Sequence, residues 1–599
     1  MAGEHIDRRR VLQGLAAGSS LLLTGMASGC DRRRPHRGPG DRPDPRCPEG
    51  ADLLPEIEHI VIYMQENHSY DSYFGMHPRG DGYRLRHGVP TNSNPDPDGN
   101  PVTVFHAPDT CQSGRGVSQR WSSTHLQIDG GRMDGFLFDG NTNAMRYWDR
   151  SDVPFYWSLA DTFPLCDRWF TSAPCQTYPN RMYLQAATSQ GLVATDVAKA
   201  LAMPHPANGT IWERLDAFGI PWLDYCWDLP DIALFFSFWQ ANQHRVKPFL
   251  QFLADCKAGT LPAVSIVSPG ITAYTEENPR DIQLGEAYSA SVINAVMHSP
   301  AWPKTALFFM YDEHGGYYDH VRPPRAVAPD DIPPDVEAVP GTSHAFDHYG
   351  PRVPAFVISP FARRHYVSHR VHDHTSVLRF IETKWNLGAL TFRDANASNL
   401  LDCFDFRRPA FLDPPELAAP GLPATGSACQ PETPPPPTEQ TVATTTQSAN
   451  EARLAGLGLG PAALAATLEP ATTATAARPA TSAEIATSMV KPTTATAGRP
   501  AVPARSATPA KIATSATSAV EPTTSATSAT PARPAASAET ATSATSTLEP
   551  TTSTASATSA RPVVAADAST SGMSGPSMVE LTHSQDDRLQ HLRHLARPR

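Results

Sequence analysis

The sequence has no excess of positive charge, because 49 Lys and Arg residues stand against 60 Asp and Glu residues. The formal net charge is −11 and the isoelectric point is about 6.0. Proteins that bind nucleic acid usually present a basic surface, since contacts with phosphate supply most of the non-specific affinity. We therefore expect no nucleic-acid partner.

Several catalytic and metal-binding motifs are also missing. The chain has no P-loop and no H-E-x-x-H pattern. Its nine cysteines form no C-x-x-C pair and no zinc-ribbon spacing, which argues against a metal site built from cysteine. A sulfatase would need Cys or Ser in a C/S-x-P-x-R motif, but Cys175 stands four residues before Pro179. These absences disfavour a P-loop nucleotide hydrolase, a metalloprotease of the H-E-x-x-H type and a sulfatase.

The N-terminal segment, residues 1–30, has the pattern of an export signal. Arg8-Arg9 resembles a twin-arginine motif, and residues 11–28 form an apolar stretch too short for a membrane span. Cys30 ends an imperfect lipoprotein box, so a lipid anchor there is an open alternative. Export would make the protein periplasmic, cell-surface or secreted, and the other eight cysteines would then be free to form disulfides whose pairing the sequence does not reveal.

Composition divides the remaining chain into three parts. Residues 31–50 read as a linker, and residues 51–415 contain nearly all the aromatic residues expected of a folded catalytic domain. Residues 416–599 are rich in Ala, Thr, Ser and Pro. Such a tail cannot bury enough apolar surface to offset its chain entropy, so we predict that it is disordered.

Short apolar runs alternate with helical patterns across the folded part. The predicted strands are 58–64, 264–268, 305–311 and 353–359, and the predicted helices are 180–189, 285–297 and 376–385. This alternation indicates an α/β fold with a mostly parallel sheet flanked by helices. In such sheets ligands bind beyond the carboxyl ends of the strands.

Polar residues follow two of these strands directly. Glu66-Asn67 could provide carboxylate and amide oxygens to a divalent metal, or could simply cap a helix or turn. Asp312-Glu313 places two acids side by side, which repel each other unless a cation or an arginine lies between them. A metal site and an ion-paired loop are both compatible with this second pair.

Thr177 precedes Arg181 at the start of a predicted helix. A hydroxyl in that position could act as a nucleophile where amide groups favour an anion, or it could serve only as a helix cap. Arg181 could bind a phosphoryl group with two hydrogen bonds.

Histidines occur at several further positions. His320 is a possible ligand or acid–base group, and His125 alone carries little information. His372 and His374 flank Asp373, so this trio could bind a metal or could be a surface helix cap.

Four long segments, taken in order, resemble a bacterial phosphoesterase family that includes phospholipases C of the non-haemolytic type and a group of acid phosphatases. The segments are IEHIVIYMQENHSYDSYFG, DVPFYWSLADTFPLCDRWF with TYPNRMYLQAATS, FFMYDEHGGYYDHVRPP, and YGPRVPAFVISPFAR with HDHTSVLRFIETKW. They extend over about residues 56–405. The resemblance implies an alkaline-phosphatase-like sandwich, in which a mixed sheet lies between helices.

The resemblance also implies a site with one divalent metal ion, which could be Ca, Mg, Mn or Zn. The implied metal ligands are Glu66, Asn67, Thr177, Asp312 and Glu313. Thr177 matches the nucleophile, which would form a phosphothreonine that water then hydrolyses. Arg181 and His320 would contact the substrate, and histidines would protonate the leaving alcohol.

Two positions depart from the family pattern. Gln119 and Asn278 stand where relatives usually carry histidine. Both can donate hydrogen bonds to a phosphate, but neither transfers a proton near neutral pH. His125 is then the remaining candidate for the general acid.

The sequence therefore predicts an exported metal-dependent hydrolase of phosphate esters, with phospholipid and phosphomonoester substrates both open. The alternative is a slow or non-catalytic exported protein that keeps the fold and the metal. The sequence does not indicate an oligomeric state.

Overall fold

The computed structural model describes residues 37–270, 272–336 and 344–439. The predicted export signal, Cys30 and most of the predicted tail lie outside these described residues. Among the residues that are described, no helix has the length and apolarity needed to cross a membrane.

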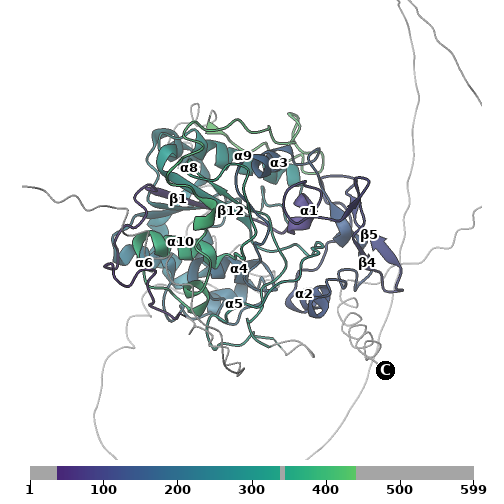
Figure 1. The fold of residues 1–599 in the computed structure, drawn as a ribbon, viewed down its shortest axis with the longest axis horizontal. Coiled ribbons are helices and arrows are strands. Elements are labelled where there is room, and N and C mark those ends of the chain that lie inside the picture. The colour runs from purple at the N-terminus through teal and green to yellow at the C-terminus, as the bar shows by residue number, and fades with distance from the viewer. Residues whose placement is uncertain (1–36, 271, 337–343, 440–599) are drawn as a thin grey trace, which may run out of the picture. The chain divides into compact units, whose positions relative to one another are not determined.

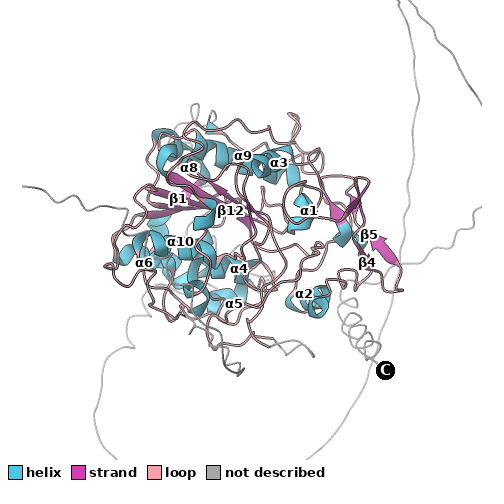
Figure 2. Ribbon diagram, viewed as in Figure 1, coloured by secondary structure: helices cyan, strands magenta, loops and turns pink. Residues whose placement is uncertain are grey.

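The domain is organised around an eight-stranded mixed sheet (Figures 1 and 2). In spatial order its strands are β10 (Val246–Pro248), β9 (Trp222–Cys226), β11 (Val264–Ser268), β1 (His59–Gln65), β12 (Thr305–Tyr311), β13 (Ala355–Ile358), β8 (Leu165–Cys166) and β14 (Val367–Ser368). The first five strands are parallel to one another, β13 is antiparallel to both neighbours, and β8 and β14 are parallel.

The central strands are apolar along their whole length because both faces of the sheet are covered. Every residue of β12 is buried, and in β1 only the first residue is partly exposed. A continuous run of β-branched and aromatic residues is typical of a parallel strand that lies between two helical layers.

Helices cover both faces of the sheet. Figure 1 shows α3 (Pro154–Thr162), α8 (Phe249–Ala258) and α9 (Ile282–Met297) above the strands, and α4 (Thr177–Ala186), α6 (Ile211–Ala217) and α10 (Thr375–Trp385) below them. The other helices are α1 (Tyr70–Phe74), α2 (Trp121–Ile128), α5 (Val197–Ala202), α7 (Phe236–Ala241) and α11 (Phe392–Ala395).

Three small sheets lie apart from the main one. They pair β2 (Leu85–Arg86) with β3 (Val89–Pro90), β4 (Ser93–Pro95) with β5 (Pro101–Thr103), and β6 (Phe105–His106) with β7 (Arg146–Tyr147).

The structure confirms the predicted α/β class with a mixed, mostly parallel sheet and flanking helices. The four predicted strands are β1, β11, β12 and β13, and the three predicted helices are α4, α9 and α10. Sequence reasoning missed the outer strands of the sheet. These four strands, β8, β9, β10 and β14, have only two to five residues each, and β9 carries an Asp within it, so no periodic apolar run marks them.

Both ends of the described chain pack against the domain beyond the limits 51–415 drawn from composition. In the segment read as a linker, Asp44 and Cys47 accept hydrogen bonds from the side-chain amide of Asn386. In the segment assigned to the tail, Cys429 forms a disulfide with Cys111. Local composition did not reveal these contacts because their partners are hundreds of residues away in sequence.

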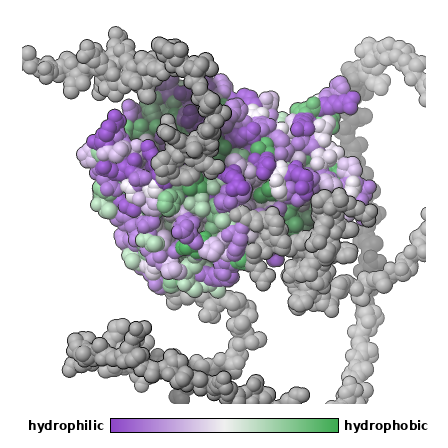
Figure 3. All heavy atoms as spheres, turned by 60° about the horizontal axis from the view of Figure 1, so that its bottom comes forward, coloured by the Kyte–Doolittle hydropathy of each residue, from purple (hydrophilic) through white to green (hydrophobic). Residues whose placement is uncertain are grey.

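The surface mixes polar and apolar residues, as Figure 3 shows for the face turned forward. The large exposed apolar side chains come from many parts of the described chain: Leu85, Val89, Phe218, Ile332, Val336, Val371, Phe392 and Leu412.

Removing the Cys111–Cys429 disulfide should destabilise the domain. Because this bond closes a loop across 318 positions of sequence, the Cys111→Ser/Cys429→Ser variant should lose about 2–4 kcal/mol of unfolding free energy. Denaturant unfolding of the oxidised proteins measures this loss. Cys47→Ser, which alters a free cysteine, is the matched control and should unfold like the parent. Equal stability of all three proteins would contradict the prediction.

Candidate metal and nucleophile site

The two polar pairs predicted from sequence lie together at one edge of the sheet. Strands β1 and β12 pair in parallel, with Gln65 opposite Tyr311 at their carboxyl ends. The next residues, Glu66 and Asp312, therefore leave neighbouring strands at the same level. The backbone amide of Asn67 donates to Asp312 Oδ1 at 3.1 Å, which closes the connection between the two strand ends.

The turns after both strands have unusual backbone conformations. Asn67 has a φ of 68°, a left-handed conformation that is costly for a residue other than glycine and is frequent at functional sites. Gly315 lies directly against Asn67, and a Cβ at that position would come within 2.0 Å of the Asn67 carbonyl oxygen. The glycines after Asp312-Glu313 thus allow the two turns to approach each other closely.

Thr177 is the first residue of α4, and its side chain points to the same place. Its Oγ1 donates to Asn67 Oδ1 at 3.4 Å. The preceding loop is fixed by Asn180, whose side chain accepts from the amide of Ala173 and donates to the carbonyl of Cys175. Asn180 therefore determines where α4 begins and where the threonine hydroxyl lies.

Arg181 lies one turn further along α4, buried among carboxylates. Its guanidinium is 3.2 Å from Glu66 Oε1, 2.9 Å from Asp231 Oδ1 and 3.4 Å from Asp312 Oδ2. The prediction that Arg181 binds substrate remains a prediction. We call Glu66, Asp312 and Glu313 the acidic cluster. The contacts of Arg181 in the structure are those of a residue that offsets charge in this cluster and holds Glu66 near Asp312.

Burial sets the protonation of these acids. Burial raises the pKa of Asp312 to about 8, and the nearby charge of Glu66 adds to this shift while Arg181 opposes it. Burial also raises the pKa of Glu66, and burial with the adjacent Asp312 raises that of Glu313 well above its usual range. One guanidinium is thus insufficient to keep all of these carboxyl groups ionised.

The residues present fit a divalent cation. Among the described residues, Asp312 Oδ2 and Glu313 Oε1 are buried and have no hydrogen-bond partner, although Asp312 Oδ2 forms an ion pair with Arg181 Nε at 3.4 Å. A buried carboxylate oxygen without a partner, such as Glu313 Oε1, is costly unless a cation or a proton binds it. Carboxylate, amide and hydroxyl oxygens from Glu66, Asn67 and Thr177 are donors that hard and borderline divalent ions accept.

Two buried histidines contact the acids Asp312 and Glu313. His374 Nε2 donates to the backbone carbonyl of Asp312 at 2.8 Å, while its Nδ1 accepts from the indole of Trp169. His314 contacts Glu313 and the side chain of Gln127. Burial lowers the pKa of both histidines to about 3, so they are neutral. His374 has both ring nitrogens engaged and positions Asp312.

The positions that depart from the family pattern flank a further acid. Gln119 donates to Glu277 Oε1 at 3.4 Å, and Asn278 donates to the carbonyl of Gln112. His125 lies on α2, where its Nδ1 donates to the carbonyl of Trp121 at 2.8 Å. Burial lowers its pKa. None of these three residues has a described direct contact with the acidic cluster.

His320 belongs to a separate buried network. Its Nδ1 is 2.7 Å from Asp71, and Arg352 binds both Asp71 and Asp319. Burial favours the neutral ring, but the carboxylates of Asp71 and Asp319 outweigh it and raise the pKa of His320. The structure thus does not bring His320 together with the acidic cluster, and its role in substrate binding remains a prediction.

Sequence reasoning missed three residues that surround the cluster. Thr275 donates to Glu66 Oε2 at 2.7 Å and also accepts from the amide of Glu277. Burial, reinforced by the charge of Glu66, raises the pKa of Glu277 to about 7. Asp231, from a short 3-10 turn, shares Arg181 with Glu66. Only Glu277 had a signal, since it stands beside Asn278 in the motif already noted.

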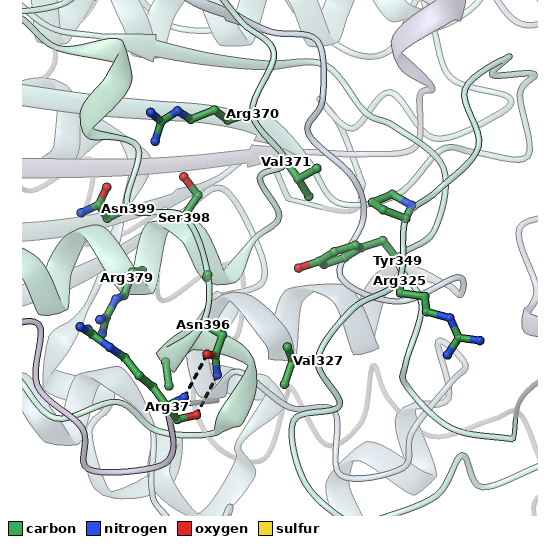
Figure 4. Close-up of a pocket in the computed structure, with 13 residues that line it drawn as sticks. Arg37, Arg325, Val327, Tyr349, Arg370, Val371, Arg379, Asn396, Ser398 and Asn399 are labelled. Atoms are coloured by element: carbon green, nitrogen blue, oxygen red, sulfur yellow. Dashed lines mark hydrogen bonds between the residues drawn. The ribbon is translucent and has the colours of Figure 1, made fainter. Parts of the chain in front are cut away.

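A separate cavity of about 860 Å³ lies away from these residues and has four arginines in its lining (Figure 4). The lining residues are Arg37, Pro324, Arg325, Val327, Tyr349, Arg370, Val371, Arg379, Ala395, Asn396, Ala397, Ser398 and Asn399. No residue of the acidic cluster lines this cavity.

Comparison with known proteins shows the family of this chain. A model of the phosphoesterase family matches residues 57–388, which is most of the folded part and includes both acid pairs and Thr177. The chain belongs to the phosphoesterase family and is a hydrolase that acts on phosphoric ester bonds.

Relatives of known name are similar over most of the same region. Phospholipase C A of Mycobacterium tuberculosis is 31% identical over 62% of this chain and 81% of its own length. The non-hemolytic phospholipase C of Burkholderia pseudomallei is 30% identical over 59% of this chain and 60% of its own length. Non-specific phospholipase C1 of Arabidopsis thaliana is 30% identical over 60% and 73%.

Among solved structures, a protein of the alkaline phosphatase superfamily from Vibrio parahaemolyticus aligns over 60% of this chain and 72% of its own length. The identity is 8% and the TM-score is 0.29.

Replacing Arg181 by methionine should destabilise the metal-free protein by about 3–5 kcal/mol, because it leaves Glu66 and Asp231 buried without their counter-charge. The exposed Arg132 bridges Asp129 and Asp134, so Arg132→Met is the matched control and should cost at most about 1 kcal/mol. Urea unfolding in the presence of chelator compares the two variants. Equal losses would show that the acids do not depend on Arg181.

Proposed function

We propose that this chain hydrolyses phosphoric esters with Thr177 as the nucleophile and with one bound divalent cation. The observation that carries the proposal has two parts. The Thr177 hydroxyl contacts Asn67, which bonds to Asp312, and the next residue, Glu313, has a buried carboxylate oxygen without a partner among the described residues. Helix capping does not explain the hydroxyl, because Thr177 is the first residue of α4 and its Oγ1 donates to Asn67 Oδ1. It also does not explain why Glu313 Oε1 is buried without a donor.

The proposed cation ligands are Glu66, Asn67, Thr177, Asp312 and Glu313. A cation of the Ca, Mg, Mn or Zn type, when bound, would lower the pKa of the threonine hydroxyl and offset charge on the phosphoryl oxygens.

The residues of the chain have distinct tasks in this proposal. Thr177 Oγ1 loses its proton to solvent and attacks phosphorus, and the bond from phosphorus to the alcohol oxygen breaks as the alcohol accepts a proton. Water then attacks the phosphothreonine, which releases the phosphoryl product and returns a proton to Thr177 Oγ1. The amino end of α4, at Thr177, favours the negative phosphoryl group through the positive end of the helix dipole.

Two residues are candidates to protonate the leaving alcohol. His125 retains an imidazole near the position of the missing histidines, but its lowered pKa restricts the protonated form to acidic pH. Glu277 is protonated at higher pH, lies next to Gln119 and is linked through Thr275 to Glu66. We propose His125 as the acid. Glu277 is the alternative, because it lies beside Gln119 and Thr275.

The proposed substrate is a phosphodiester of the phospholipid type, because three relatives from different organisms are named phospholipases C. A phosphomonoester is the second candidate. Family membership favours a hydrolase over the non-catalytic alternative. We also propose export through the segment 1–30, with lipidation at Cys30 as an open variant of that proposal.

Thr177→Ala should lower turnover by at least about 1000-fold while leaving the cation bound, because the carboxylates remain. Assays with p-nitrophenyl phosphate and p-nitrophenyl phosphorylcholine, each with metal analysis, test the nucleophile and the ester class together. Thr177→Ser is the matched control and should retain measurable activity. Full activity of the alanine variant would disprove the nucleophile.

The pH profile of kcat/KM should identify the acid. A proton donor acts only below its pKa, so activity should fall as pH rises through the lowered pKa of His125, and His125→Gln should lose this dependence together with roughly 100- to 10,000-fold in rate. If Glu277 is the acid, the fall should occur near pH 7 and should disappear in Glu277→Gln instead. A profile unchanged in both variants would exclude both residues.

A further inference from the structure

A second group of potential metal ligands lies outside the acidic cluster. Cys166 at the end of β8, Cys403 at the end of a 3-10 turn, and His372 before α10 each place one ligand atom within 4.8 Å of the others. All three residues are buried. They are separated by up to 237 positions in sequence, so no local spacing motif predicts this group.

The hydrogen bonds of His372 leave one ring nitrogen free. Its Nε2 donates to Ser368 Oγ at 2.9 Å, and Ser368 in turn donates to Asp402 Oδ2 at 2.6 Å. Among the described residues, the buried Nδ1 has no hydrogen-bond partner. Metal-binding histidines usually donate their other ring nitrogen to a carboxylate or a hydrogen-bonded neighbour, which is the arrangement seen at Nε2.

The two thiols are also suited to coordination. Cys166 and Cys403 are free in a structure that forms the Cys111–Cys429 disulfide. The hydrogen bond with Cys403 and burial raise the pKa of Cys166 well above its usual range, so this thiol keeps its proton until a cation displaces it. Burial lowers the pKa of His372 to about 4, which keeps its ring neutral.

We propose that Cys166, Cys403 and His372 bind a thiophilic metal ion of the Zn²⁺ type, separate from the cation of the acidic cluster. Binding converts two thiols to thiolates and releases two protons, with no change of oxidation state. Ser368 and Asp402 orient the imidazole. Thiolate and imidazole ligands select Zn²⁺ or Cu⁺ over Ca²⁺ and Mg²⁺, so the two sites differ in ligand chemistry.

The surroundings of these three residues indicate what the metal ion would do. The arginine-lined cavity of Figure 4 reaches Arg370 and Val371, immediately before His372, and Ser398 and Asn399, shortly before Cys403. His372 is two residues from His374, which holds the carbonyl of Asp312. A metal ion here would fasten β8 and the turn at Cys403 to the loop that positions the acidic cluster, which is a structural role.

Zinc content of the full-length protein tests the proposal. Cells are grown with added Zn²⁺, and metal per chain is measured after removal of free ions. The Cys166→Ser/Cys403→Ser variant should hold one Zn²⁺ fewer than the parent. The matched control, Cys226→Ser/Cys256→Ser, replaces buried free cysteines of β9 and α8 and should hold the same number as the parent. An unchanged zinc count in the first variant overturns the proposal.

Two further measurements keep the test decisive if the double variant does not fold. Asp402→Asn retains all three ligands and should weaken Zn²⁺ binding roughly 10- to 100-fold, because it disturbs the Ser368–Asp402 bond that orients His372. Peptide mapping of the unreduced parent should find Cys166 and Cys403 as thiols that alkylate only after chelation. A Cys166–Cys403 disulfide, or thiols that alkylate freely without chelator, would overturn the proposal.

Discussion

The parallel pairing of β1 with β12 is the constraint on which the site depends. Both strands are buried on both faces, so their register is fixed by packing in two helical layers. Because β1 and β12 end at the same level, the residues that follow them, Glu66 and Asp312, lie next to each other. The acidic cluster is therefore a consequence of strand register, and its backbone connection from Asn67 to Asp312 completes it.

This placement has an electrostatic cost that shapes the rest of the site. Buried carboxyl groups next to one another favour protonation, as the raised pKa values of Asp312 and Glu313 indicate. Arg181 offsets part of the charge from within the protein. The charge that remains is what a divalent cation would offset, which connects the stability of the domain to the chemistry we propose for it.

The role of each histidine follows from its environment in the fold and not from its sequence motif. His314 and His374 are neutral supports of the acids, whereas His320 is held by carboxylates in a different network. His372, only two residues from His374, lies with two thiols instead. Residues that look equivalent in sequence thus acquire different tasks, because burial and neighbouring charge decide which protonation state each ring adopts.

The α/β class, the central strands and the two acid pairs could be predicted from sequence alone, since long apolar runs followed by polar residues are local signals. The sequence also indicated the phosphoesterase family, which the comparisons show. Three relations became visible only in the tertiary structure: Arg181 lies among the acids, Glu277 lies beside Gln119, and Cys166 lies near Cys403. These relations connect residues far apart in the chain, and their chemistry depends on burial, which composition and spacing do not specify.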